Sequence, residues 1–189
     1  MVDHYIASVP TNTTPNSLAR VAVDQAITQP ISMSDQGIEW LKKMEGTIKE
    51  GDKHILYNDS QGYATIGYGH LVAKKKVKDL NESVKLPFKD GLTEDIATEQ
   101  FKKDLNWVED GIHKNVSASL SQTQFDSLVS IGFNAGRSAL VKSTIVQSIE
   151  IGDAKKAVED IKTFNTGGVN ITRRACESKL FDEGIYEDK

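Results

Sequence analysis

Apolar residues spaced three and four positions apart predict that most of the chain after residue 33 is helical. Ser34 is a preferred helix N-cap residue and Gly46 a preferred helix terminator, so the first helix is expected over 35–45. Ile38 and Leu41 fall on one face of this helix, which marks the side expected to pack on the core.

A longer apolar stripe predicts a second helix over about 93–115, with Thr93 as its cap. The residues of the stripe are Ile96, Ala97, Phe101, Leu105, Val108 and Ile112. A helix of this length in a small protein usually connects two lobes. Shorter helical patterns follow over about 116–189, and with the first helix they predict an all-α lobe.

Between these helices the pattern changes to that of a small β-containing lobe, over about 46–92. Residues 57–70 read YNDSQGYATIGYGH, which predicts two strands joined by a turn at SQG. The Lys-rich residues 72–91 are expected to form an irregular surface loop. The fold class is therefore α+β, mostly α, with one domain over 34–189.

Residues 1–33 differ from the rest because they are polar and interrupted by proline. We interpret them as a tail or docking arm with one short amphipathic helix over 18–27. The N-terminus lacks the basic start and apolar centre of a signal peptide, and no apolar run reaches the length of a membrane span. We therefore expect no stable membrane insertion.

Composition excludes several classes of function. The chain has 189 residues and a net charge of −4, without the basic stripe typical of nucleic-acid binders. Cys176 is the single cysteine, so neither an internal disulfide nor a cysteine metal cluster is possible. The four histidines lack HxxxH spacing, so no zinc site is expected.

Three polar residues suggest chemistry at the junction of the lobes: Glu45, Asp59 and Thr65. Glycoside hydrolysis needs one protonated carboxyl group and one ionised carboxylate from separate elements. The end of the first helix should raise the pKa of Glu45, and backbone N–H groups of the turn should hold Asp59 as an anion. Spacing alone leaves open two ordinary surface carboxylates.

Several motifs in one order resemble the phage-type lysozymes, glycoside hydrolase family 24, over roughly residues 35–182. They are Glu45-Gly46, Tyr57-x-Asp59-x-x-Gly62-Tyr63-x-Thr65-Ile66-Gly67-Tyr68-Gly69-His70, Leu92-Thr93-Glu94 with Asp104, Gln124-Phe125-Asp126-Ser127-Leu128-Val129-Ser130, Phe133-Asn134-Ala135-Gly136, Ser143-Thr144, Gly152-Asp153, Gly167-Gly168 and Arg173-Arg174-x-x-Glu177-x-x-Leu180-Phe181.

The resemblance implies a lysozyme-like fold of two lobes and muramidase activity on peptidoglycan glycan strands, by a monomer that needs no metal or organic cofactor. Glu45 would be the general acid, and Asp59 with Thr65 would position the attacking water, so that the anomeric configuration is inverted. The two carboxyl groups would then be roughly 6.5–9.5 Å apart.

The resemblance also indicates residues around the site. His70 and Asp104 are expected to form a structural ion pair that raises the pKa of His70. The last helix is expected to turn Arg173 toward Glu45. The candidate substrate-binding residues are Gln61, His70, Phe133, Asn134 and Arg173. Phe133 fits a core aromatic residue equally well.

One departure from the family is the spacing of the carboxylates. Thirteen residues separate Glu45 from Asp59, whereas the family has eight and would place the second carboxylate at His54. We interpret residues 47–54 as holding an insertion of about five residues, which a loop can accommodate. Asp52 is the alternative second carboxylate, and an insertion over the cleft would alter or block substrate fit.

The expected setting is a phage endolysin that accumulates in the host cytoplasm and reaches the periplasm through a holin-made hole. Alternatives are a virion-associated lysozyme or an effector delivered by a secretion system, with residues 1–33 as a docking arm. A catalytically impaired cell-wall-binding module with the same fold is the main alternative function, because a fold does not prove an activity. Another inverting glycosidase, such as a chitosanase, is a third.

Overall fold

The computed structural model describes residues 30–167 and 169–188, and Ile31–Lys189 form one compact unit. The predicted arm over 1–33, including its helix over 18–27, lies outside the described residues except for its last four. Met33 is buried, and its backbone N–H donates to Glu109 Oε1 at 2.9 Å. The chain is therefore already anchored one residue before the first cap.

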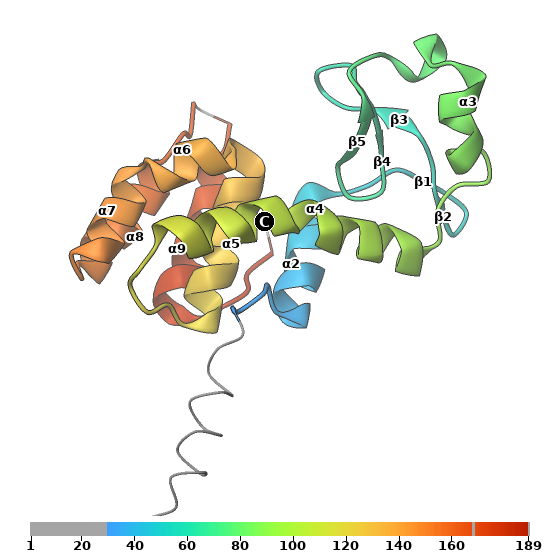
Figure 1. The fold of residues 1–189 in the computed structure, drawn as a ribbon. Coiled ribbons are helices and arrows are strands. Elements are labelled where there is room, and N and C mark those ends of the chain that lie inside the picture. Colours follow the sequence, from blue (N-terminus) through green and yellow to red (C-terminus); the bar gives the residue numbers. More distant parts are fainter. Residues whose placement is uncertain (1–29, 168, 189) are drawn as a thin grey trace, which may run out of the picture. The chain divides into compact units, whose positions relative to one another are not determined.

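Helix α2 spans Asp35–Glu45, as the sequence predicts (Figure 1). The Ser34 side chain accepts from the Gly37 N–H at 2.9 Å and satisfies one of the unpaired donors at the helix start. Gly46 has a φ of 69°, which favours glycine and ends the helix.

Helix α4, Glu94–Asn115, begins at the predicted cap Thr93 and connects the β-containing lobe to the helical lobe (Figure 1). Ala97, Phe101 and the later residues of the predicted stripe are buried. Ile96 was expected in that stripe, but it is 55% exposed. Successive helix residues are about 100° apart, so when Ala97 faces the core Ile96 points away from it.

The β-containing lobe has two small antiparallel sheets instead of one hairpin. One sheet has the order β3-β4-β5, formed by Tyr57–Asn58, Ala64–Ile66 and His70–Ala73. The predicted two strands are thus present, and the third strand β5 was not predicted. The other sheet pairs β1, Lys49–Glu50, with β2, Lys53–His54, inside the segment expected to be a loop.

The Lys-rich segment over 72–91 is less irregular than predicted. Its first two residues belong to β5, and three short turns of helix follow: η1 (Val77–Asp79), α3 (Glu82–Lys85) and η2 (Leu86–Phe88). None of the three turns buries a residue, and Leu80 between them is buried. Segments this short have no helical periodicity for a sequence pattern to reveal.

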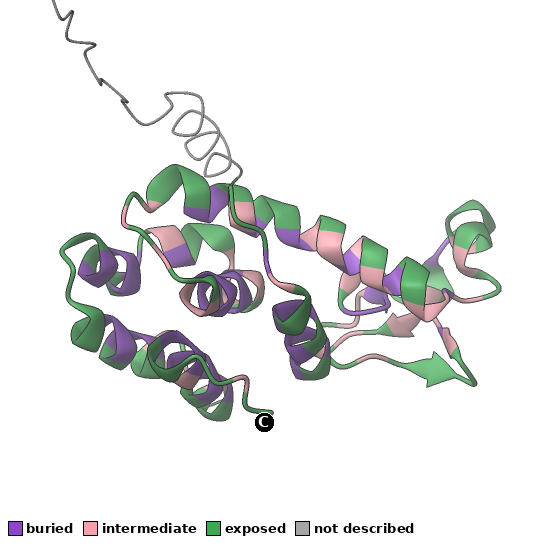
Figure 2. Ribbon diagram, turned by 90° about the horizontal axis from the view of Figure 1, so that it is seen from below, coloured by how far each residue is buried: buried purple, intermediate pink, exposed green. Residues whose placement is uncertain are grey.

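Among the described residues, the helical lobe has five more helices. They are α5 (Gln122–Ala135), α6 (Arg137–Val141), α7 (Thr144–Glu150), α8 (Ala154–Thr163) and α9 (Ile171–Glu183). Ser121 and Gln124 form the predicted capping box of α5. Figure 2 shows the buried residues on the faces where these helices meet. The fold class is α+β, mostly α.

Among the described residues, every helix is too short or too polar to cross a membrane.

Candidate active site

Glu45 is the last residue of α2, and its side chain is 17% exposed. Arg173 Nη2 of α9 lies 2.8 Å from Glu45 Oε1, so Arg173 points toward this carboxylate as expected. Oε1 accepts no well-aligned hydrogen bond from any residue the structure describes, although this contact is short. The contact is therefore a charge–charge interaction, which does not depend on the donor angle as a hydrogen bond does.

A buried cluster of charges holds Arg173 in place. Its Nε donates to Glu177 Oε1 at 2.9 Å, and its Nη2 donates to Ser130 Oγ at 3.1 Å. Arg174 pairs with the other oxygen of Glu177. Burial alone would lower the pKa of Arg173, but the carboxylates of Glu45 and Glu177 outweigh it and raise that pKa. A permanent positive charge thus faces Glu45.

Asp59 lies at the turn between β3 and β4, where its own backbone closes the hairpin. Asp59 Oδ1 accepts the backbone N–H groups of Gln61 at 2.9 Å and Tyr63 at 2.8 Å. Gly62 has a φ of 82°, a conformation that the turn requires and that glycine adopts without strain. The second oxygen, Oδ2, has no hydrogen-bond partner among the described residues and can accept one from water.

Thr65 lies on β4 opposite Tyr57 of β3, and it is 3% exposed. Its hydroxyl donates to the Tyr63 carbonyl at 3.1 Å, which leaves the Oγ1 lone pairs as acceptors. Burial raises the pKa of Tyr57, and the charges of Asp59 and Glu45 raise it further. One phenol therefore lies within the field of both carboxylates.

Tyr57 was not among the predicted site residues. Its place could have been read from the strand period, because residues two apart on a strand share one face. Tyr57 and Asp59 have that spacing. The structure thus pairs Thr65 with Tyr57 across the strands, and the charges of Glu45 and Asp59 both act on the Tyr57 phenol.

His70 and Asp104 form the expected ion pair, with His70 Nδ1 2.9 Å from Asp104 Oδ2. The hydrogen bond from Asp104 raises the pKa of His70 in spite of partial burial. Gln100 Nε2 also donates to Asp104 at 2.9 Å. The pair joins β5 to the middle of α4.

The other predicted substrate-binding residues have mixed surroundings. The Phe133 ring packs edge-on against Phe101 with centroids 5.4 Å apart, as a core aromatic residue would. Asn134 is exposed, but its Oδ1 accepts from Arg174 Nη2 at 2.8 Å. Gln61 is exposed at the turn beside Asp59. Their contacts with sugar stay predictions.

The alternative second carboxylate, Asp52, and the position that the family spacing predicts, His54, both lie in or next to the β1–β2 hairpin. Asp52 is exposed in the turn between β1 and β2. His54 is fully buried and pairs through its backbone with Leu92, just before α4. The β1–β2 hairpin is therefore attached to the start of α4. Asp59 shares its hairpin with Thr65, and Asp52 does not.

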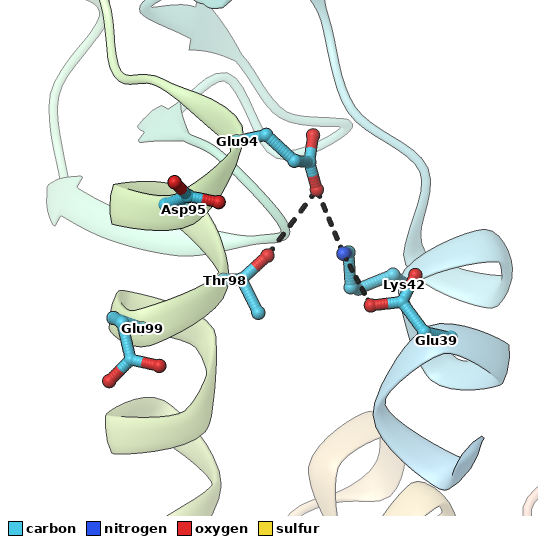
Figure 3. Close-up of a pocket in the computed structure, with 6 residues that line it drawn as sticks. All are labelled: Glu39, Lys42, Glu94, Asp95, Thr98 and Glu99. Carbon is cyan, nitrogen blue, oxygen red and sulfur yellow. Dashed lines mark hydrogen bonds and ion pairs between the residues drawn. The ribbon is translucent and has the colours of Figure 1, made fainter. Parts of the chain in front are cut away.

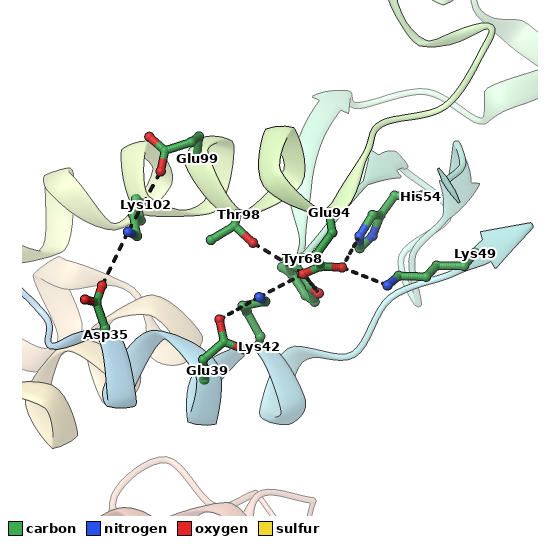
Figure 4. Close-up of polar contacts among 10 residues, drawn as sticks. All are labelled: Asp35, Glu39, Lys42, Lys49, His54, Tyr68, Glu94, Thr98, Glu99 and Lys102. Atoms are coloured by element: carbon green, nitrogen blue, oxygen red, sulfur yellow. Dashed lines mark hydrogen bonds and ion pairs between the residues drawn. The ribbon is translucent and has the colours of Figure 1, made fainter. Parts of the chain in front are cut away.

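A second cluster of charges surrounds Glu94, the first residue of α4 (Figure 4). Burial would raise the pKa of Glu94, but its hydrogen bonds outweigh burial and hold that pKa well below the usual range. The donors are Lys42 and Lys49, each at 2.8 Å, His54 at 3.0 Å, Tyr68 at 2.6 Å and Thr98 at 3.3 Å. The sequence predicted no function for Glu94, which appeared there only as part of the Leu92-Thr93-Glu94 motif.

Beside this cluster a pocket of about 490 Å³ opens between α2 and α4 (Figure 3). Its lining residues are Glu39, Lys42, Glu94, Asp95, Thr98 and Glu99. It contains none of the three candidate catalytic residues. Four carboxylates around one lysine do not match the acid and the water-binding pair predicted for Glu45, Asp59 and Thr65.

Comparisons with known proteins point to one family. The phage lysozyme family model matches residues 47–177. The endolysin of Salmonella phage P22 is 32% identical over 80% of this chain and 98% of its own length. The endolysin of Bacillus phage B103 is 28% identical over 82% of this chain, which spans 55% of that endolysin. A crystal structure of P22 lysozyme mutant L86M superposes with a TM-score of 0.64 at 30% identity, over 80% of this chain and 98% of its own. The chain belongs to the phage lysozyme family.

Proposed function

We propose that this member of a peptidoglycan-hydrolysing family is a muramidase, which cleaves the β-1,4 bond between N-acetylmuramic acid and N-acetylglucosamine with inversion. The observation that carries the proposal is the pair of carboxylates around Tyr57. Glu45 is presented by a helix end and Asp59 by a turn, and both act on the pKa of the same phenol. Separate carboxylates on separate elements suit an acid and a base with different tasks.

In the proposed reaction Glu45 acts as the acid from its protonated form, and Asp59 acts as the base from its ionised form. Asp59 Oδ2 and Thr65 Oγ1 accept the hydrogen bonds of one water and hold it against the face of the sugar opposite the leaving group. The water oxygen attacks C1 as the glycosidic bond breaks. Glu45 gives its proton to the leaving oxygen, and Asp59 takes one from the water, so charge and atoms balance.

Arg173 has a specific part in this scheme. Glu45 becomes an anion as it gives up its proton, and the guanidinium 2.8 Å away is already in place to stabilise that charge. Preorganised charges of this kind need no rearrangement at the moment of reaction. Because Glu177 and Ser130 hold the guanidinium, Arg173 keeps its position while the proton moves.

The relatives named as endolysins support a role in lysis of a host cell wall. Release to the periplasm through a holin-made hole stays a prediction.

The proposal is tested by the turbidity loss of outer-membrane-stripped Gram-negative cells. Wild type should clear the cells, and Glu45→Gln and Asp59→Asn should each abolish clearing while remaining folded. Asp52→Asn is the matched control and should clear like wild type. Clearing that survives in Asp59→Asn would contradict the assigned base, and cells that wild type binds without clearing would indicate a binding module.

Inversion of the anomeric configuration is tested separately by NMR. The anomeric proton of the freshly released reducing end should appear first in the α form by NMR, because the substrate bond is β. First appearance of the β form would contradict the role given to the water.

A further inference from the structure

Glu94 is bonded to α2, to the β1–β2 hairpin and to the turn that follows β4 (Figure 4). Lys42 is in the last turn of α2, three residues before Glu45. Tyr68 follows β4 by two residues and Thr65 by three. One carboxylate therefore lies between the helix end that presents the proposed acid and the strand that presents the water-binding hydroxyl.

We propose that Glu94 is a positioning residue, which fixes the distance between Glu45 and the Asp59–Thr65 hairpin during glycan hydrolysis. This inference rests on the muramidase activity proposed above. It assigns Glu94 an effect on the rate of the chemical step, which a residue that only stabilises the fold would not have.

The bond to α2 goes through a buried lysine. Lys42 is 8% exposed, and its Nζ lies 2.8 Å from both Glu39 and Glu94. Burial would lower the pKa of Lys42, but these two carboxylates outweigh burial and raise it. A buried ammonium group needs its partners, so the last turn of α2 cannot move away from Glu94 at low cost. Because a helix turn is rigid, Glu45 cannot move away either.

The bond to the β-sheet goes through a buried phenol. The Tyr68 hydroxyl donates to Glu94 at 2.6 Å, and its ring packs on Phe101 and against His54. Burial and the Glu94 carboxylate both raise the pKa of Tyr68, so it stays a hydrogen-bond donor. Through Gly67, this contact fixes the end of β4 and with it Thr65.

The inserted hairpin is tied to the same carboxylate. Lys49 of β1 and His54 of β2 both contact Glu94 Oε2, and Thr47 Oγ1 lies 2.7 Å from His54 Nδ1. A longer connection between Glu45 and Asp59 would ordinarily loosen their relative position. Here the connection is anchored at its middle, and Glu94 offsets the loosening.

Glu94 is 42% exposed, so solvent screens its pairs and limits their contribution to the free energy of unfolding. Catalysis is more sensitive than stability to small displacements. A misplacement of about 1 Å far from the reacting atoms costs about 100-fold in rate. The expected signature is therefore a loss of kcat that exceeds any loss of stability.

The test is steady-state hydrolysis of purified peptidoglycan, followed as released reducing ends over a range of substrate concentrations. Glu94→Gln should lower kcat about 10- to 100-fold and leave KM within about twofold. Glu150→Gln is the matched control, because Glu150 also accepts several hydrogen bonds, from Ser117 and Ala118, far from the site. It should keep both constants of the wild type.

A second pair of variants isolates the bond to α2. Lys42→Met removes that bond and keeps Glu94, and it should reproduce the loss of kcat. Lys43→Met, next to it, removes only an exposed pair with Asp188 and should have no effect. This pair keeps the inference testable if Glu94→Gln does not fold.

Failure of the positioning role and failure of the proposed muramidase activity would give different results. An active wild type with unchanged kcat in folded Glu94→Gln and Lys42→Met would overturn the positioning role and leave the muramidase intact. A change of KM alone would overturn it too, since KM alone reports binding. An inactive wild type would overturn the proposed function and this inference with it.

Discussion

The carboxylates of Glu177 and Glu94 each accept several hydrogen bonds, but in opposite surroundings. Glu177 is fully buried in the helical lobe and is held by two arginines and Ser130. Glu94 is 42% exposed where the lobes meet and is held mainly by lysines, a histidine and a tyrosine. The buried cluster presents Arg173 to Glu45, and the exposed one fixes the helix that carries Glu45.

The contrast distinguishes a cluster that stabilises the fold from a cluster that positions Glu45. A buried charge that loses its partner cannot be solvated, so the fold depends on the Glu177 cluster. An exposed carboxylate that loses its partners is solvated by water, so the fold depends less on Glu94. One cluster contacts Glu45, the proposed acid, and the other contacts the helix that carries it, so variants can separate the two effects.

The largest expected effect is on folding. Glu177→Ala leaves two arginines buried beside each other and should lower the free energy of unfolding by about 3–5 kcal/mol. Glu94→Ala is the matched variant and should lower it by about 1–2 kcal/mol, because Lys42 keeps Glu39 and His54 keeps Thr47 as a partner. Urea unfolding of both measures the difference. Equal losses would remove the distinction between the two clusters.

The next effect is on catalysis, at the point where the buried cluster meets the site. Arg173→Lys keeps a charge but loses the planar fork that contacts Glu45, Glu177 and Ser130 together. We expect kcat to fall about 10- to 100-fold. Arg137→Lys, at an exposed position of helix α6, is the control and should act like wild type. Full activity in Arg173→Lys would show that the fork does not orient Glu45.

A smaller effect concerns the other contact between the β-sheet and α4. Since the folded state raises the pKa of His70, its pairing with Asp104 stabilises the protein fully below about pH 6.5. That stabilisation is lost as the pH rises through the raised pKa. Asp104→Asn should therefore lower the free energy of unfolding by about 1–2 kcal/mol at pH 5.5.

As the pH rises through the raised pKa of His70, the same substitution should cost progressively less, because His70 then loses its charge in wild type too. Asp110→Asn, at an exposed position of the same helix, should show no such dependence. A cost for Asp104→Asn that is independent of pH would mean that a charged His70 does not make the contact.

The smallest effect is the acid dependence of the Glu94 cluster. Its pKa is lowered by folding, so its stabilisation is present above about pH 4.5 and is lost as the pH falls toward the folded-state value. Discounted for exposure, the loss should be about 0.5–1 kcal/mol. Unfolding of Glu94→Gln between pH 3 and 6 should be flatter than that of wild type by this amount. Parallel curves would contradict the lowered pKa.

Local signals account for what the sequence predicted well. Ser34, Thr93 and Gly46 act within one turn of their own helices, and the Asp59 turn is closed by residues two and four positions away. Such interactions join residues that are close together in the sequence, so sequence patterns predict them. The starts of α2 and α4 and the hairpin of Asp59 and Thr65 followed from them.

Long-range contacts explain what the sequence did not show. Strands β1 and β2 have two residues each, too few for a period, and His54 is held by Leu92 almost forty positions on. The partners of Glu94 come from Lys42 to Thr98, a span that no motif covers. Arg173 was predicted only from the family resemblance, because its contact with Glu45 joins the first and the last helix of the domain.

The most direct test of the central claim is the identity of the reducing ends that the enzyme creates. Purified peptidoglycan is digested with wild type and with Glu45→Gln, then reduced with borohydride and analysed by mass spectrometry. Wild type should give fragments ending in reduced N-acetylmuramic acid, and Glu45→Gln should give about 100- to 10,000-fold less. Fragments ending in reduced N-acetylglucosamine or in an anhydro sugar, or undiminished release by Glu45→Gln, would contradict the assignment of Glu45 as the acid of a muramidase.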